Sequence, residues 1–201
     1  MKEKIIAQLS ELGAIKFGEF TLKSGILSPI YIDLRMIVSD PSLLENIAQA
    51  FKVLSSDLKY DRVAGIPYTA LPMATAFSLL TKIPMIYPRK EVKGYGTKKQ
   101  IEGIFKSGET VLVIDDLITN GLSKFETFDV LEAEGLKVTD VAVLIDREQG
   151  GREALIEKGY KLHSLISVFE VIDQLKSSGK ISEELYQKSQ QFLIDNSTIK
   201  P

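Results

Sequence analysis

The fold is decided by one stretch of the chain, Thr110-Val111-Leu112-Val113-Ile114-Asp115-Asp116-Leu117-Ile118-Thr119-Asn120-Gly121-Leu122-Ser123. Residues 110–114 form an apolar run of the kind found in strands that are buried on both faces. Two adjacent acids and a small polar loop follow, and a helical pattern then runs from residue 123 to residue 133 and closes near Gly135. A buried strand that leads through a loop into a helix is the unit from which parallel sheets are built.

The rest of the chain repeats this alternation. Short apolar runs predict strands at residues 62–66, 85–87 and 138–145, and helical spacing predicts helices at residues 5–12 and 71–80. Asp40 followed by Pro41 marks the start of another helix, and Ser167 and Ser182 begin two more. Two extended pieces, residues 20–23 and 30–35, form an N-terminal flap. The alternation predicts an α/β fold with a doubly wound, mostly parallel sheet.

Length and composition narrow the class of protein. The chain has 201 residues, a formal net charge of −2, no cysteine and one histidine. This length favours one domain, residues 1–201, in which approximately residues 1–40 form a small hood with part of the C-terminal region. Without cysteine there are no disulfides, thiolate nucleophiles or zinc–cysteine sites. The balanced charge predicts no nucleic-acid partner, and the lack of a signal peptide or a spanning apolar run predicts a cytoplasmic protein with no membrane partner.

The two acids and the polar loop have a shared chemical use. Ligands of parallel sheets bind at the carboxyl ends of strands, where Asp115 and Asp116 can accept hydrogen bonds from the vicinal diol of a ribose. The loop from Thr119 to Ser123 can present backbone N–H groups and hydroxyls to a phosphate at the start of a helix. On the residues alone an alternative stays open, in which the acids form an ordinary turn and Ser123 caps the helix.

A basic loop, residues 89–99, follows the strand at residues 85–87. It reads Arg-Lys-Glu-Val-Lys-Gly-Tyr-Gly-Thr-Lys-Lys, with five cations against one acid. A solvated surface hairpin is one interpretation of this loop. The other is a lid hinged at Gly94 and Gly96, whose cations reach an anion at the ligand-binding edge of the sheet.

The order of apolar strand, paired acids, Thr-Asn-Gly-Leu-Ser and helix resembles the phosphoribosyl-pyrophosphate (PRPP) motif of the type I phosphoribosyltransferases. With residues 17–33, 65–72, 89–103 and 146–151 it resembles orotate phosphoribosyltransferase, in the order of that family and over nearly the whole chain. Residues 93–98, Lys-Gly-Tyr-Gly-Thr-Lys, are similar to the transferase half of bifunctional uridine-monophosphate synthases. The resemblance implies the type I phosphoribosyltransferase fold. The implied activity is transfer of the 5-phosphoribosyl group from PRPP to orotate, giving orotidine 5'-monophosphate and pyrophosphate in the biosynthesis of UMP.

The same resemblance assigns roles to individual residues. The catalytic residues would be Lys93, Asp115 and Asp116. Orotate would contact Lys23 and Arg147, with Tyr31 and Ile32 beside its ring and Thr119 at its edge. The pyrophosphate would be surrounded by Tyr68, Thr69, Arg89, Lys90 and Lys93. The ribose 5-phosphate would be held by Asp115, Asp116, Leu117, Ile118, Thr119, Asn120, Gly121, Leu122 and Ser123. Mg²⁺ would arrive on the pyrophosphate without a protein cage, and the basic loop would reach into the neighbouring site of a homodimer.

Two positions depart from many bacterial members of that family, which carry Asp and His where this chain has Gly94 and Tyr95. Tyr95 is therefore expected to donate hydrogen bonds to the substrate rather than to transfer protons. Two alternative functions remain, a phosphoribosyltransferase for another base and a non-catalytic regulator that binds PRPP. Lys23 and Arg147 favour orotate, and the absence of a separate DNA-binding segment before residue 40 disfavours the regulator.

Overall fold

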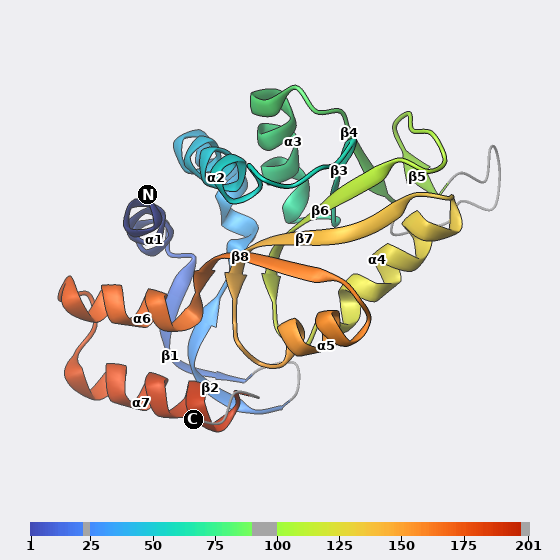
Figure 1. Cartoon of the computed structure of the whole chain (residues 1–201). Coiled ribbons are helices and arrows are strands. Elements are labelled where there is room, and N and C mark those ends of the chain that lie inside the picture. The colour runs from blue at the N-terminus through green and yellow to red at the C-terminus, as the bar shows by residue number, and fades with distance from the viewer. Residues whose placement is uncertain (22–24, 90–99, 198–201) are drawn as a thin grey trace.

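A mostly parallel sheet forms the centre of the protein. The computed structural model describes residues 1–21, 25–89 and 100–197 (Figure 1). Within these ranges, six strands lie side by side in the order β5-β4-β3-β6-β7-β8. Every neighbouring pair is parallel except β4 and β5. The strands are β3 (Arg62–Gly65), β4 (Met85–Pro88), β5 (Ile101–Glu102), β6 (Thr110–Ile118), β7 (Lys137–Asp146) and β8 (Lys161–Ser167). The predicted α/β fold with a mostly parallel sheet is confirmed.

Helices cover both faces of this sheet, which explains why residues 111–114 of its central strand β6 are all apolar. Successive side chains of β6 point to opposite faces. Leu112 and Ile114 join a core shared with helices α1 (Lys2–Glu11), α2 (Pro41–Leu54) and α3 (Ala70–Thr81). Val111 and Val113 join a second core with helices α4 (Leu122–Ala133) and α5 (Gly151–Glu157) on the other face (Figure 1).

A hairpin near the N-terminus stands apart from the main sheet. Strands β1 (Ile15–Thr21) and β2 (Leu27–Ile32) are antiparallel, and β2 packs against the C-terminal helix α7 (Glu183–Asp195) (Figure 1). Helix α7 in turn packs on α6 (Val168–Ser177). The division of residues 1–201 into one domain with a hood stays a prediction.

Three predicted helix starts are present with the expected caps. The Asp40 side chain accepts a hydrogen bond from the backbone N–H of Leu43 at 3.0 Å, and Pro41 is the first helical residue. Ser167 opens α6 with a capping box, and Ser182 caps α7. These caps satisfy backbone donors that a helix leaves unpaired at its N-terminus.

Several predicted boundaries were wrong. The first extended piece begins earlier than predicted, at Ile15, and residues 22 and 23 of the predicted segment 20–23 lie outside the described residues. The second ends at Ile32, because Asp33 caps a 3₁₀ helix, Leu34–Ser39. Strand β5 and helix α5 were missed, since two residues and seven residues give little periodicity. Strand β6 continues four residues beyond the predicted end, because β7 extends beside it and pairs as far as Ile118.

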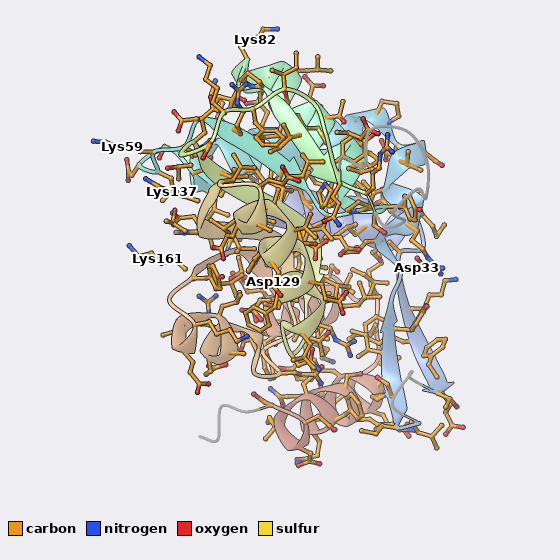
Figure 2. All side chains as sticks on the ribbon, turned by 90° about the vertical axis from the view of Figure 1, so that its right-hand side faces the viewer. Asp33, Lys59, Lys82, Asp129, Lys137 and Lys161 are labelled. Atoms are coloured by element: carbon orange, nitrogen blue, oxygen red, sulfur yellow. The ribbon has the colours of Figure 1, made fainter. Side chains whose placement is uncertain are left out.

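The amino ends and the carboxyl ends of the strands lie at opposite sides of the sheet. Lys137 begins β7 and Lys161 begins β8, and Figure 2 shows both projecting, with Lys59, from the side of the molecule opposite to Asp33. The carboxyl ends of the strands lie at the other edge. In the described part of the chain, no helix is both long enough and apolar enough to cross a bilayer.

Candidate active site

Most of the predicted site residues meet at the carboxyl edge of four adjacent strands. Tyr68 and Thr69 follow β3, Arg89 follows β4, residues 115–123 end β6 and lead into α4, and Arg147 follows β7. Backbone hydrogen bonds join these ends, since Arg147 N donates to Ile118 O at 3.0 Å. The strand order therefore gathers residues that are up to 79 positions apart in the sequence.

Two further predicted residues belong to the N-terminal hairpin, and four lie outside the described residues. Tyr31 and Ile32 lie on β2 of the separate hairpin, where the ring of Tyr31 stacks on Phe20 with centroids 5.4 Å apart. Neither residue lines the cavities described below. Lys23, Lys90, Lys93 and Tyr95 lie outside the described residues.

The acid pair lies within β6 rather than after it. Asp115 and Asp116 are successive strand residues, so their side chains leave opposite faces of the sheet. Asp115 is buried, and both of its carboxylate oxygens are engaged. Oδ1 accepts the backbone N–H of Asp116 at 2.8 Å, and Oδ2 accepts the ammonium of Lys124 at 2.6 Å. The two acids therefore have different surroundings, and their expected role as acceptors for a ribose diol stays a prediction.

Asp116 is the acid whose pKa is raised. Burial, and then the neighbouring negative charge of Asp115, raises the pKa of Asp116 from its usual value near 4 to about 7. One of its oxygens accepts the backbone N–H of Leu117 at 2.7 Å, which opposes this rise. Asp116 therefore changes charge near neutral pH, as a group that interacts with a developing positive charge could.

The loop between β6 and α4 has the backbone form that an anion site requires. Gly121 has a φ of 79°, which favours glycine, and it is the N-cap of α4 without a side-chain capping bond. Ser123 lies in the first turn and is exposed, so the alternative interpretation of Ser123 as the cap is wrong. The side chain of Asn120 accepts the N–H of Leu122 at 3.3 Å. The start of α4 is thus open to solvent at its N-terminus, where helices attract anions.

The start of α5 packs closely against the loop between β6 and α4. A Cβ atom placed on Gly151 would lie 2.4 Å from Cγ1 of Ile118 and 2.7 Å from the carbonyl oxygen of Thr119. Such distances are too short for real contacts, so only glycine lets the start of α5 approach the anion loop this closely.

The substitution Gly151→Ala is expected to lower stability by about 1–3 kcal/mol through overpacking and to weaken PRPP binding, because the methyl group pushes on Thr119. Urea unfolding and calorimetric titration with PRPP measure the two effects. Gly159→Ala is the matched control. Gly159 has a φ of 86° and no neighbour near a Cβ, so alanine there strains only the local backbone. Gly151→Ala with normal PRPP affinity would show that the contact does not support the loop.

A cavity of about 470 Å³ lies between β3, β4 and α4. The predicted residues Arg89, Asp115 and Ser123 line it, together with Glu126 and Thr127 of α4, which were not predicted. A smaller recess of about 180 Å³ is lined by Tyr68 and Arg89 among others. Arg89 forms an ion pair with Glu102 of β5, so its charge is already partly compensated.

Arg147 is half-buried, and its side chain lacks a full set of partners among the described residues. Its Nε is buried and, within the part of the chain that the structure describes, has no hydrogen-bond partner. Burial lowers the pKa of Arg147 from its usual value, although an arginine stays charged. The preceding Asp146 shapes this turn by accepting the N–H of Glu148 at 2.8 Å and a bond from Arg152 at 3.1 Å. A half-buried guanidinium with an unused donor is suited to a carboxylate ligand.

The most informative residue that sequence reasoning missed is Lys124. It lies four residues before Phe128 and seven before Leu131, so helical spacing places it on the buried face of α4. A buried lysine requires a partner of opposite charge, and the nearby acids of β6 supply one. This signal was present in the sequence. The pairing of Arg89 with Glu102 had no comparable signal, since β5 is only two residues long.

Comparison with known proteins supports the class that the fold and this edge indicate. The profile of the family described as "Phosphoribosyl transferase domain" matches residues 34–176. This match covers well over half of the chain, which therefore belongs to the phosphoribosyl transferase domain family.

Two curated relatives and two solved structures refine this placement. The chain is 44% identical to the uridine 5'-monophosphate synthase of Bos taurus over 97% of its own length and 41% of that protein. It is 43% identical to the orotate phosphoribosyltransferase of Caenorhabditis elegans over 88% of its length and 78% of that protein. The Leishmania donovani UMP synthase structure matches 96% of the chain, and 42% of that protein, with a TM-score of 0.88 and 36% identity. The orotate phosphoribosyltransferase of Mycobacterium tuberculosis in complex with PRPP matches 85% of the chain and 98% of that protein, with a TM-score of 0.71 and 26% identity.

Within its family, the chain thus falls among the orotate phosphoribosyltransferases. It spans about two fifths of the length of the bovine synthase.

Proposed function

We propose that the protein transfers the 5-phosphoribosyl group from PRPP to orotate, releasing pyrophosphate and forming orotidine 5'-monophosphate for the biosynthesis of UMP. The observation that supports orotate most directly is Arg147, whose buried Nε has no hydrogen-bond partner among the described residues and lies at the same edge as the acid pair. Orotate differs from uracil by a carboxylate, and a carboxylate is what an arginine fork binds best.

The ribose phosphate would bind over the end of β6. The loop from Thr119 to Ser123 precedes helix α4 and offers the 5-phosphate a helix N-terminus, and Asp116 lies beside it in the strand. Asp116 would accept a hydrogen bond from a ribose hydroxyl in its ionised form. Tyr68 and Arg89, which line one recess, would lie on the pyrophosphate side.

The reaction would be a displacement at C1 of the ribose through an oxocarbenium-like state. The bond from C1 to the pyrophosphate oxygen breaks, a bond from C1 to the ring nitrogen of orotate forms, and the nitrogen's proton passes to solvent. Since this N–H is more acidic than an ordinary amide, the enzyme would need no strong base. Lys93, in the basic loop, would stabilise the negative charge that grows on the departing oxygen. Positioning and electrostatics would account for most of the rate enhancement.

Mg²⁺ and a second subunit belong to the proposal. Mg²⁺ prefers oxygen ligands, and the pyrophosphate of PRPP would supply them. Within the described residues, no group of three or more His, Cys, Asp or Glu is placed to hold a metal ion. When bound, the ion would neutralise charge on the pyrophosphate. The basic loop would serve the neighbouring site of a homodimer in the cytoplasm.

A panel of bases tests this proposal against its alternatives. The purified protein is incubated with PRPP and Mg²⁺, and pyrophosphate release is measured with orotate, uracil, adenine and hypoxanthine in parallel. Release with orotate alone is expected. Release with uracil or a purine would assign a different base, and binding of PRPP without release for any base would favour the regulator.

A further inference from the structure

Lys124 is a buried cation that the proposed reaction has not yet used. Its side chain is 2% exposed. The ammonium donates to Asp115 Oδ2 at 2.6 Å and to the carbonyl oxygen of Leu117 at 2.8 Å. Lys124 belongs to the first turn of α4, while both acceptors belong to the C-terminal part of β6. Lys124 therefore joins the two elements that flank the anion loop.

The charges at this point explain why a cation is needed there. Two carboxylates on adjacent residues, next to a loop proposed to bind a phosphate, would repel each other and the substrate. The ammonium of Lys124 compensates one of these charges at hydrogen-bonding distance. Asp115 also receives the backbone N–H of Asp116, so its carboxylate is held at both oxygens. The same ammonium also favours the ionised form of Asp116, against the burial and the Asp115 charge that raise the pKa of Asp116.

We propose that Lys124 is a positioning residue for PRPP, which acts by holding the Asp115 carboxylate in place and cancelling its charge at the ribose-phosphate site. This inference rests on the proposed use of the β6–α4 loop for the ribose phosphate. Held in this way, Asp115 presents a fixed carboxylate to the cavity between β3, β4 and α4. The contact of the ammonium with the Leu117 carbonyl fixes the same stretch of backbone from the helix side.

A double-mutant cycle between Lys124 and Asp115 tests whether one residue acts through the other. Lys124→Met, Asp115→Asn and the double variant are compared in kcat/KM for PRPP and in PRPP affinity measured without orotate. Coupling within one network corresponds to about 2- to 150-fold. We expect Lys124→Met to lower kcat/KM about 10- to 100-fold, mainly through KM for PRPP, and to change it less than about threefold in the Asp115→Asn background.

The absence of cysteine from the chain permits a chemical rescue. Lys124→Cys introduces a unique thiol, which is alkylated in the unfolded protein with 2-bromoethylamine to rebuild an ammonium of nearly lysine length. Wild-type protein carried through the same unfolding and refolding controls for losses. Aminoethylation should restore most of the PRPP affinity, while alkylation with iodoacetamide, which adds a neutral amide, should not.

Loss of a buried cation can also damage folding, so a stability control is needed. Arg62→Met removes the cation of another enclosed ion pair, with Glu109, at the opposite end of β3. It should lower stability without changing KM for PRPP. If Lys124→Met does not fold, the double variant replaces it, because neither charge is then left alone, and it should fold with weakened PRPP binding.

The outcomes separate this inference from the proposed function. A folded Lys124→Met or double variant with wild-type PRPP affinity would overturn the inference, as would equal losses in both backgrounds. A wild-type protein that binds PRPP but does not consume orotate would overturn the proposed activity, while the cycle in PRPP affinity would still decide the role of Lys124.

Discussion

Replacing Arg147 by methionine is expected to abolish efficient use of orotate while leaving PRPP binding nearly unchanged. Truncating one partner of a buried charge pair costs about 2–5 kcal/mol, which is roughly 30- to 4,000-fold in kcat/KM for orotate. Methionine fills a similar volume without the charge, so the loss should come from the carboxylate contact. Steady-state kinetics with each substrate varied in turn measure the change.

The stability of the same variant provides an internal check. Because Nε of Arg147 is buried without a partner among the described residues, its removal should not lower the melting temperature of the free protein. Arg147→Lys keeps the charge but loses the planar fork. Its kcat/KM for orotate should therefore lie between those of wild type and Arg147→Met. An Arg147→Met variant with an unchanged KM for orotate would assign the carboxylate to other residues.

Asp116 is expected to give the reaction its dependence on pH. Its pKa is raised to about 7 by burial and by Asp115, so in the free enzyme the carboxylate is mostly protonated at pH 6 and mostly ionised at pH 8. The ionised carboxylate stabilises the positive charge that develops on the ribose in the transition state. The value of kcat/KM for PRPP should therefore rise through pH 7, and Asp116→Asn should lower it about 100-fold at pH 8 and abolish this rise.

Stability should change in the opposite direction. A carboxyl group whose folded pKa lies above its unfolded value near 4 binds its proton more tightly in the folded state. Its contribution to stability is therefore present below pH 4 and lost as the pH rises toward 7 and above. Asp116→Asn should consequently raise the melting temperature at pH 8, whereas Asp129→Asn, on the exposed side of α4 (Figure 2), should change neither property. A destabilised Asp116→Asn variant that keeps the pH-dependent rise would contradict both expectations.

The parallel core of the fold could be predicted because its signals are local. The apolar run of β6 and the Asp40–Pro41 and Ser167 helix starts depend on residues within a few positions of each other. The end of β6 could not be predicted in this way. Its last four residues are polar and aliphatic in mixture, and they stay in the sheet because β7 provides partners from a distant part of the chain.

In the candidate site, too, features that depend on neighbouring residues could be predicted, and features that depend on contacts between elements could not. The sequence pointed to the acid pair and the loop from Thr119 to Ser123, since both come directly after one apolar run, residues 110–114. The sequence did not reveal that Asp115 is paired with Lys124, because this ion pair depends on how α4 packs against β6. That Nε of Arg147 has no partner among residues 1–21, 25–89 and 100–197 is likewise a property of packing around the end of β7. Contacts between elements therefore determine how the surroundings of the two adjacent acids differ.

The central claim is transfer of the phosphoribosyl group to orotate, and one absorbance measurement tests it most directly. Orotate loses ultraviolet absorbance when its ring nitrogen is ribosylated. We expect this loss when the purified protein, PRPP and Mg²⁺ are all present, and its reversal when pyrophosphate is added in excess. Unchanged absorbance in a preparation that binds PRPP would contradict the account.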